Sequence, residues 1–122
     1  MQSIKDVSKE LHFQKYDVDF ICTTKSGNEQ WIEVKYDRET ERTRHIVYET
    51  KSNGNVGCLA RSIADLVLYI TDKNIYWFDL EELRNYIYIT KPKEITMGDN
   101  ARGYLLELDE LLKIGKVHIA SQ

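Results

Sequence analysis

The chain is short of the residues that interrupt regular structure. Its 122 residues include one proline and six glycines, with no internal repeat and no low-complexity tract. Linkers and disordered tails depend on such residues, so we expect neither. Hydrophobic residues make up 42% of the chain, which is enough for one core and too little for two. We therefore expect a single domain over residues 1–122.

Cysteines and long apolar runs are also scarce. Cys22 and Cys58 lie in apolar stretches without the CxxC spacing of a zinc site, so we expect both to be reduced core residues. No segment approaches the roughly 20 apolar residues that span a membrane, and the first residues lack the apolar stretch of a signal peptide. The sequence therefore predicts a cytoplasmic location and no membrane partner.

An excess of positive charge is absent as well. The formal net charge is −3, which argues against a protein that coats nucleic acid through bulk electrostatics. Residues 35–61 are an exception, because six basic and four acidic residues make this stretch locally positive. Any contact with nucleic acid is therefore expected to be local.

The hydrophobic pattern predicts a mixed α/β fold of the α+β kind, in which strands outnumber helices. Apolar residues at spacings of three and four predict a short helix over residues 3–11, whereas the charged residues 37–44 have no apolar stripe and predict an exposed loop. Alternating or continuous apolar segments predict strands over residues 16–24, 30–36, 45–50, 66–70, 75–78 and 103–108. Helical segments are predicted over residues 80–86, capped by Asp79, and over residues 109–114, with a short helix or turn over residues 57–65.

Three charged residues stand out on the first two predicted strands. Turn residues at 26–28 join these strands into a hairpin, which brings Asp19 and Glu33 to the same end of the ladder. Glu33 and Lys35 share a face, because alternate residues of a strand point the same way. Two carboxylates and the backbone carbonyl of Val34 form an oxygen set that suits Mg²⁺ or Mn²⁺. Such a cation activates water and stabilises charge on a phosphodiester, while Lys35 orients or helps to deprotonate the water. The alternative is that Glu33 and Lys35 merely face solvent, since Glu-x-Lys is a common pattern.

The order of these elements resembles the PD-(D/E)XK nuclease superfamily. The order is a short helix, a strand with an acid, a hairpin, and a strand with Glu-x-Lys. The resemblance implies a restriction-endonuclease-like fold, with a central mixed β-sheet flanked by short helices. It also implies a Mg²⁺- or Mn²⁺-dependent endonuclease that hydrolyses DNA, with Asp19 and Glu33 as metal ligands and Lys35 as the catalytic lysine. The proline that often precedes the first acid is replaced by Val18, and Asp17 lies one strand period earlier. Asp17 and Asp19 therefore stay alternatives for the first ligand, and Asp19 matches the family pattern better.

The likeness extends over about residues 17–112 to small phage-encoded members of the superfamily. These members have a third strand ending in an acid, a loop with a Gly-apolar pair, and Ala-Asp before an aromatic strand. The matching segments are residues 45–49, 57–59 and 64–65. The likeness implies a role in phage or mobile-element DNA processing. Glu49 becomes a candidate fourth acid, because the third strand can lie beside the strand of Glu33, and the alternative is a solvated glutamate at a strand end.

Polar residues near this site in sequence are candidates for contacts with the DNA backbone: Arg38, Arg42, Arg44, Lys51, Arg61 and Ser62. Each is equally an ordinary residue of a solvated loop, and Asp65 is expected to act as a structural cap. A domain this small covers little DNA, so cutting both strands predicts a two-fold homodimer. The rival hypothesis is a catalytically inactive module of the same fold that binds nucleic acid or a protein partner, which the net acidity favours.

Overall fold

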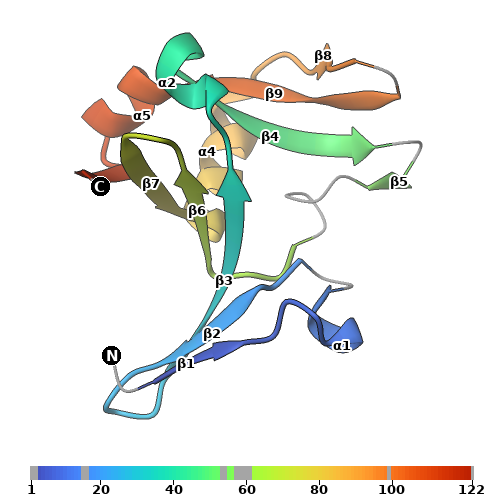
Figure 1. Cartoon of the computed structure of the whole chain (residues 1–122). Coiled ribbons are helices and arrows are strands. Elements are labelled where there is room, and N and C mark those ends of the chain that lie inside the picture. Colours follow the sequence, from blue (N-terminus) through green and yellow to red (C-terminus); the bar gives the residue numbers. More distant parts are fainter. Residues whose placement is uncertain (1–2, 15–16, 53–54, 57–61, 99, 122) are drawn as a thin grey trace.

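The computed structural model describes residues 3–14, 17–52, 55–56, 62–98 and 100–121. Over these residues it has a mixed α+β fold with two sheets (Figure 1), as the hydrophobic pattern predicts. The six-stranded sheet has the order β1 (Ser3–Asp6), β2 (Phe20–Thr23), β3 (Glu29–Tyr36), β6 (Leu66–Ile70), β7 (Asn74–Asp79) and β10 (His118–Ser121). The four-stranded sheet has the order β5 (Asn55–Val56), β4 (His45–Ser52), β9 (Ala101–Glu107) and β8 (Ile95–Thr96).

The described helices are α1 (Leu11–Gln14), α2 (Glu39–Thr43), α4 (Leu80–Thr90) and α5 (Leu108–Lys113). The longest of them, α4, has 11 residues, and none in the described part of the chain is long and apolar enough to cross a membrane. The predicted N-cap of α4 is confirmed, because the Asp79 side chain accepts a hydrogen bond from the Glu82 backbone N–H at 3.0 Å.

β2 and β3 form the predicted hairpin, with Phe20 opposite Ile32 and Thr23 opposite Glu29. Gly27 occupies the turn at φ +89°, a region that glycine enters without a steric penalty. β3 also pairs in parallel with β6, so that Glu33 lies beside Val67. β3 is therefore an internal strand, with both edges occupied.

The predicted opening helix over residues 3–11 is wrong. Its first half forms β1, which pairs antiparallel with β2 and places Ile4 opposite Cys22. The open edge of β2 exposes backbone donors and acceptors, and strand pairing satisfies them. A single turn of apolar spacing is a weak helix signal by comparison. Cys22 itself is a buried free cysteine, as predicted, whereas Cys58 lies outside the described residues.

The predicted loop over residues 37–44 is also wrong, because it contains α2. The helix lies against the sheet through polar contacts: Oε1 of Glu41 accepts hydrogen bonds from Thr71, Asn74 and Tyr76 at 2.8, 2.9 and 2.9 Å. Apolar periodicity in the sequence does not indicate a helix that packs through polar contacts.

The main core lies between one face of the six-stranded sheet and a layer made of the second sheet, α4 and α5. The sheet contributes Val67, Tyr69, Tyr76 and Phe78, and the facing layer contributes Ile46, Tyr48, Leu80, Leu83, Leu106, Leu108 and Leu111. Alternation along β6 and β7 therefore points Leu68 and Trp77 to the opposite face.

β4 does not lie beside β3, the arrangement that would have made Glu49 a neighbour of Glu33. β2 and β6 occupy both edges of β3, and β4 instead pairs with β9 in the second sheet. Gly103 of β9 permits this close pairing, because a Cβ there would lie 2.4 Å from the Tyr48 carbonyl oxygen. The pairing is irregular between Glu49 and Lys51, next to this glycine.

Candidate active site

Asp19 lies where the β2–β3 ladder ends, next to the strand that carries Glu33. It directly precedes β2, whose first residue, Phe20, pairs with Ile32. The Asp19 N–H donates to the Ile32 carbonyl at 2.8 Å, and its Oδ2 accepts from the Val34 N–H at 2.8 Å. The carboxylate thus takes the place of a backbone acceptor, which fixes Asp19 against the strand that carries Glu33.

Glu33 is a buried carboxyl group with an incomplete set of partners. It is 2% exposed, and Lys35 Nζ lies 3.1 Å from its Oε2. Within the described part of the chain, Oε1 is buried and has no hydrogen-bond partner, a situation that costs free energy. Burial raises the pKa of Glu33 to about 7, although Lys35 and the Ser62 hydroxyl lower it. The site therefore holds an acid whose negative charge is poorly compensated.

Asp17 lies near the same carboxyl group, since its charge also raises the pKa of Glu33. Its φ of 59° is left-handed, a conformation that aspartate adopts more readily than most residues. Asp17 is thus the acid whose charge acts on the Glu33 carboxyl. Asp19 is instead bonded to Val34, the residue after Glu33, so both acids stay alternatives for the first ligand.

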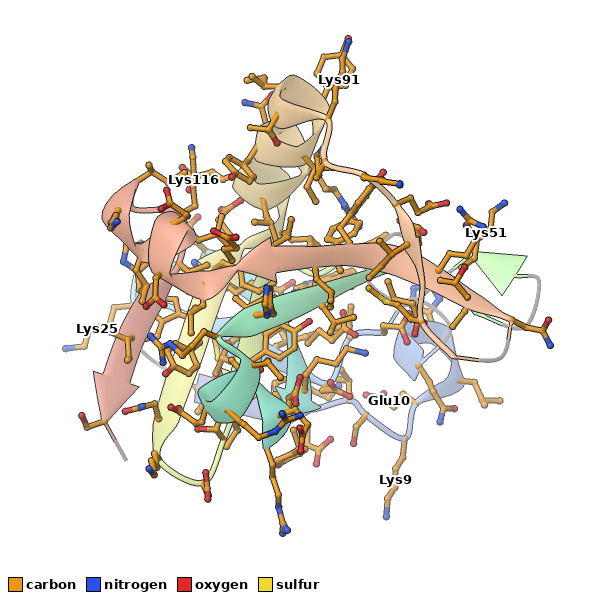
Figure 2. All side chains as sticks on the ribbon, turned by 90° about the horizontal axis from the view of Figure 1, so that it is seen from above. Lys9, Glu10, Lys25, Lys51, Lys91 and Lys116 are labelled. Carbon is orange, nitrogen blue, oxygen red and sulfur yellow. The ribbon has the colours of Figure 1, made fainter. Side chains whose placement is uncertain are left out.

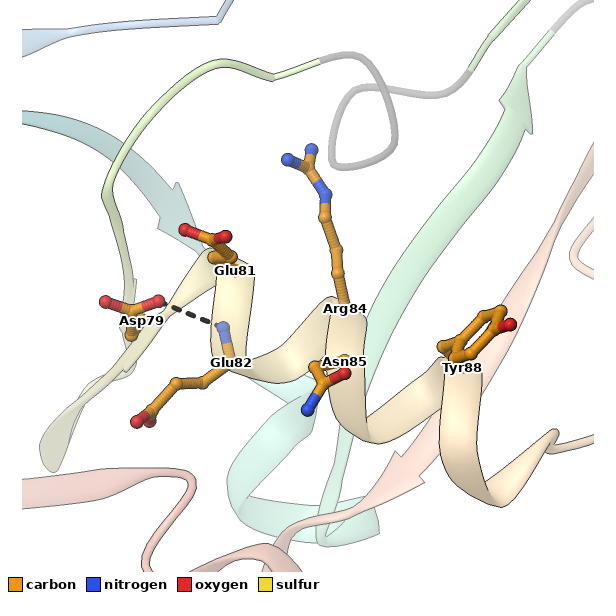
Figure 3. A pocket seen from close by; sticks show the side chains of 6 residues that line it. All are labelled: Asp79, Glu81, Glu82, Arg84, Asn85 and Tyr88. Carbon is orange, nitrogen blue, oxygen red and sulfur yellow. Dashed lines mark hydrogen bonds between the residues drawn. The ribbon is translucent and has the colours of Figure 1, made fainter.

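Ser62 lies beside Glu33 and not on an exposed loop where it would meet DNA. It is buried, and its hydroxyl accepts a hydrogen bond from the Ala64 N–H at 3.1 Å. Arg84 of α4 donates to the Ser62 carbonyl at 2.8 Å and to the Tyr48 hydroxyl at 3.1 Å. In Figure 3 the Arg84 side chain extends from α4 towards the segment that leads into β6. Arg84 thereby ties this segment to the second sheet, a role that a lone helical arginine does not reveal in the sequence.

The groove along α4 is unsuited to nucleic acid. It has a volume of about 660 Å³ and is lined by Asp79, Glu81, Glu82, Arg84, Asn85 and Tyr88 (Figure 3). Three carboxylates against one guanidinium would repel phosphate. The candidate site thus lies on β3 and not in this groove.

Asp65 is a structural cap, as predicted. Its Oδ2 accepts from the Trp31 N–H at 2.8 Å, and its own N–H donates to the Trp31 carbonyl at 2.7 Å. These bonds join the start of β6 to β3 on the edge opposite Asp19.

The predicted DNA-contacting arginines fall into different settings. Arg42 forms an ion pair with Glu39 one helical turn away, and Arg44 binds Asp109 of α5 at 2.6 Å. Arg38 and Lys51 have exposed side chains, and Lys51 lies at the rim beside β5 (Figure 2). Arg61 lies outside the described residues. Arg44 is therefore engaged in holding α2 to α5, whereas Arg38 and Lys51 are accessible.

Glu49 lies in the second sheet, opposite Gly103. It was a candidate because its strand could lie beside that of Glu33, and β6 occupies that position instead. Strand pairing therefore does not bring Glu49 to the acids of the first hairpin.

A cation at this site would depend on few side chains. Among the described residues there is no group of three or more His, Cys, Asp or Glu side chains placed to hold a metal. Asp19, Glu33 and the Val34 carbonyl fit such an ion in donor chemistry. The N–H and C=O of one strand residue point to the same side, so the Val34 carbonyl faces the edge at which Asp19 lies. Among the described residues, Oε1 of Glu33 has no hydrogen-bond partner, so this oxygen is available to bind a cation.

No protein-family model, curated protein or solved structure matches the chain. The chemistry of the site therefore depends on its own groups. These are the buried Glu33 carboxyl with the Lys35 ammonium beside it, and the Asp19 carboxylate held by the N–H of Val34.

Proposed function

We propose that the chain is a divalent-metal-dependent endonuclease that hydrolyses DNA phosphodiester bonds in phage or mobile-element DNA processing. Mg²⁺ or Mn²⁺ would be held by Asp19, Glu33 and the Val34 carbonyl. The observation that supports this most is the buried Glu33 carboxyl, which has one ammonium at 3.1 Å and an unpaired Oε1. A buried carboxylate costs several kcal/mol unless charge and hydrogen bonds compensate it, and a divalent cation would supply that compensation.

The bound cation would activate a water and offset the negative charge that builds on the phosphate. Asp19 needs no reorganisation to take part, because the Val34 N–H already fixes its carboxylate. Lys35 has a side chain that is 29% exposed, so its ammonium can pair with Glu33 and still reach a group on the solvent side. There it would donate a hydrogen bond to the attacking water or to a phosphate oxygen.

Cleavage assays with matched variants test this proposal. We expect Mg²⁺- or Mn²⁺-dependent cleavage that chelator abolishes, tested on linear, nicked, flapped and four-way-junction DNA. Asp19→Asn, Glu33→Gln and Lys35→Met should each lower the rate by about 100-fold or more, the usual effect of removing one group that stabilises transition-state charge. Glu107→Gln and Lys113→Met change exposed residues of β9 and α5 and should leave the rate unchanged. Cleavage that survives all three site variants would contradict the assigned site.

A second candidate is an inactive module of the same fold that binds nucleic acid or a protein partner. The lack of a three-ligand metal group in the described residues and the net charge of −3 favour it. Calorimetry separates the two, because the nuclease requires Mn²⁺ binding that Glu33→Gln weakens. DNA binding without detectable Mn²⁺ binding, in the presence or absence of DNA, would support the inactive module.

A further inference from the structure

One face of the six-stranded sheet has no layer packed on it in the described part of the molecule. The second sheet, α4 and α5 cover the face that carries Val67 and Phe78 (Figure 1). The other face has a shallow hollow of about 360 Å³, lined only by apolar side chains. We call this surface the open face, and its main members are Phe20, Ile32, Val34, Tyr36, Leu68 and Ile70.

The open face is continuous and uncharged at its centre. The strand register extends it from Ile4 on β1, opposite Cys22, to Trp77 on β7, opposite Leu68. Tyr36 is 82% exposed and Ile4 is 59% exposed, so large apolar side chains stand out at its margins. The largest apolar patch on the surface of a protein is often a functional one and can mark an interaction surface.

We propose that the open face binds the open face of a second copy of the chain, forming a two-fold dimer by sheet-on-sheet packing. The shape favours this partner, because a nearly flat strand surface is complementary to another sheet at about 10 Å. A small ligand would instead require a cavity that encloses it. A two-fold contact also covers both open faces at once, since the same patch serves both subunits.

The area is sufficient for a weak dimer. The sheet has six strands, and strands about 4.8 Å apart with about five residues of 3.3 Å each give roughly 400–500 Å² per copy. Two copies would thus bury roughly 800–1,000 Å², the size of a weak or transient interface. No charged side chain lines the hollow, so the centre of the open face can be covered without burying an unpaired charge. An interface of this size fits a reversible dimer.

This dimer would keep the two candidate active sites apart. Glu33 and Lys35 alternate with Ile32 and Val34 along β3 and therefore point away from the open face. In the dimer both sites would face outwards on opposite sides. The dimer inference does not depend on nuclease activity, and either can fail without the other.

Sedimentation velocity of the full chain from 1 to 100 µM tests the inference. We expect a reversible monomer–dimer equilibrium, and we expect Tyr36→Glu and Ile4→Glu each to weaken association at least ten-fold. Tyr88→Glu is the matched control, since Tyr88 is 77% exposed on α4 and far from the open face in the fold. Circular dichroism checks that each variant is folded. We expect them to fold, because Tyr36 and Ile4 are exposed. A wild-type monomer at 100 µM would overturn the inference, and so would a dimer that neither open-face variant weakens or that Tyr88→Glu weakens equally.

Discussion

At the scale of the residue, Glu33 combines burial with a charge that the Lys35 ammonium and the Ser62 hydroxyl offset only in part. Its pKa is raised to about 7 by burial, from an ordinary value of 4.5, even though Lys35 lowers it. Between these two pH values the folded chain binds a proton that the unfolded chain has released. Stability of the metal-free protein must therefore fall as the pH rises from about 4.5 to about 7 and stay at that lower level above it.

Glu33→Gln should stabilise the metal-free protein at pH 8. The expected gain is about 1–3 kcal/mol, because one pKa unit corresponds to about 1.4 kcal/mol and the buried amide still lacks a full set of partners. At pH 4 the wild-type carboxyl is protonated in both states, so the gain should nearly disappear. Urea unfolding in the presence of chelator at the two pH values measures the difference.

The control for this comparison is Glu107→Gln, which changes an exposed strand glutamate and should show no such pH dependence. Added Mn²⁺ should reduce the advantage of Glu33→Gln, because the cation would stabilise the ionised wild-type side chain. A gain that is equal at pH 4 and pH 8 would show that the charge of Glu33 is not its cause.

At the scale of the element, α2 depends on one carboxylate for its position. Burial tends to raise the pKa of Glu41, but the hydrogen bonds from Asn74, Thr71 and Tyr76 outweigh it and hold that pKa below its ordinary value. Arg44 follows the helix and binds Asp109 at 2.6 Å and the Tyr76 hydroxyl at 3.3 Å. These contacts join α2 to the turn before β7 and to α5.

Glu41→Ala should lower the free energy of unfolding by about 1–3 kcal/mol, because the Tyr76 hydroxyl loses its acceptor and Thr71 and Asn74 each lose one of theirs. Glu39→Ala is the control on the same helix. Its side chain is 64% exposed and pairs with Arg42, so we expect a change below about 0.5 kcal/mol. Urea unfolding at pH 7 distinguishes the two variants, and equal losses would mean that the Glu41 network does not hold the helix.

At the scale of the whole molecule, the position of the sites would govern the product of the proposed cleavage. The candidate site and the open face lie on opposite faces of one sheet, so the proposed dimer cannot place both sites on the same short length of duplex. The prediction that a homodimer cuts both strands together therefore does not apply to a dimer of this form. Each site would instead cut one strand independently.

Supercoiled plasmid should accordingly pass through a nicked circle that accumulates before any linear product. Tyr36→Glu should give the same ratio of nicked to linear product as the wild type, because dimerisation through the open face does not couple the sites. Agarose gels over a time course with Mn²⁺ measure both forms. Linear DNA that forms without a nicked intermediate would contradict independent sites.

The sequence by itself determined the elements whose signals are local. Alternating residues and a glycine turn define the β2–β3 hairpin, and Asp79 marks the start of α4. The same hairpin brings Asp19 beside the strand of Glu33, and the two-residue period of a strand puts Lys35 on the face of Glu33. These relations depend on residues close together in the chain, so they could be predicted.

Only the tertiary structure decided which elements lie beside one another. β1 forms where the edge of β2 needs partners, α2 is held by polar groups of distant strands, and β4 joins the second sheet because β6 occupies the edge of β3. The same packing brings Ser62 to Glu33 and Arg84 to Ser62, removes the basis for placing Glu49 there, and leaves one sheet face open. The physical reason is that backbone pairing and burial are completed by residues far apart in the chain, whose choice of partner no local pattern records.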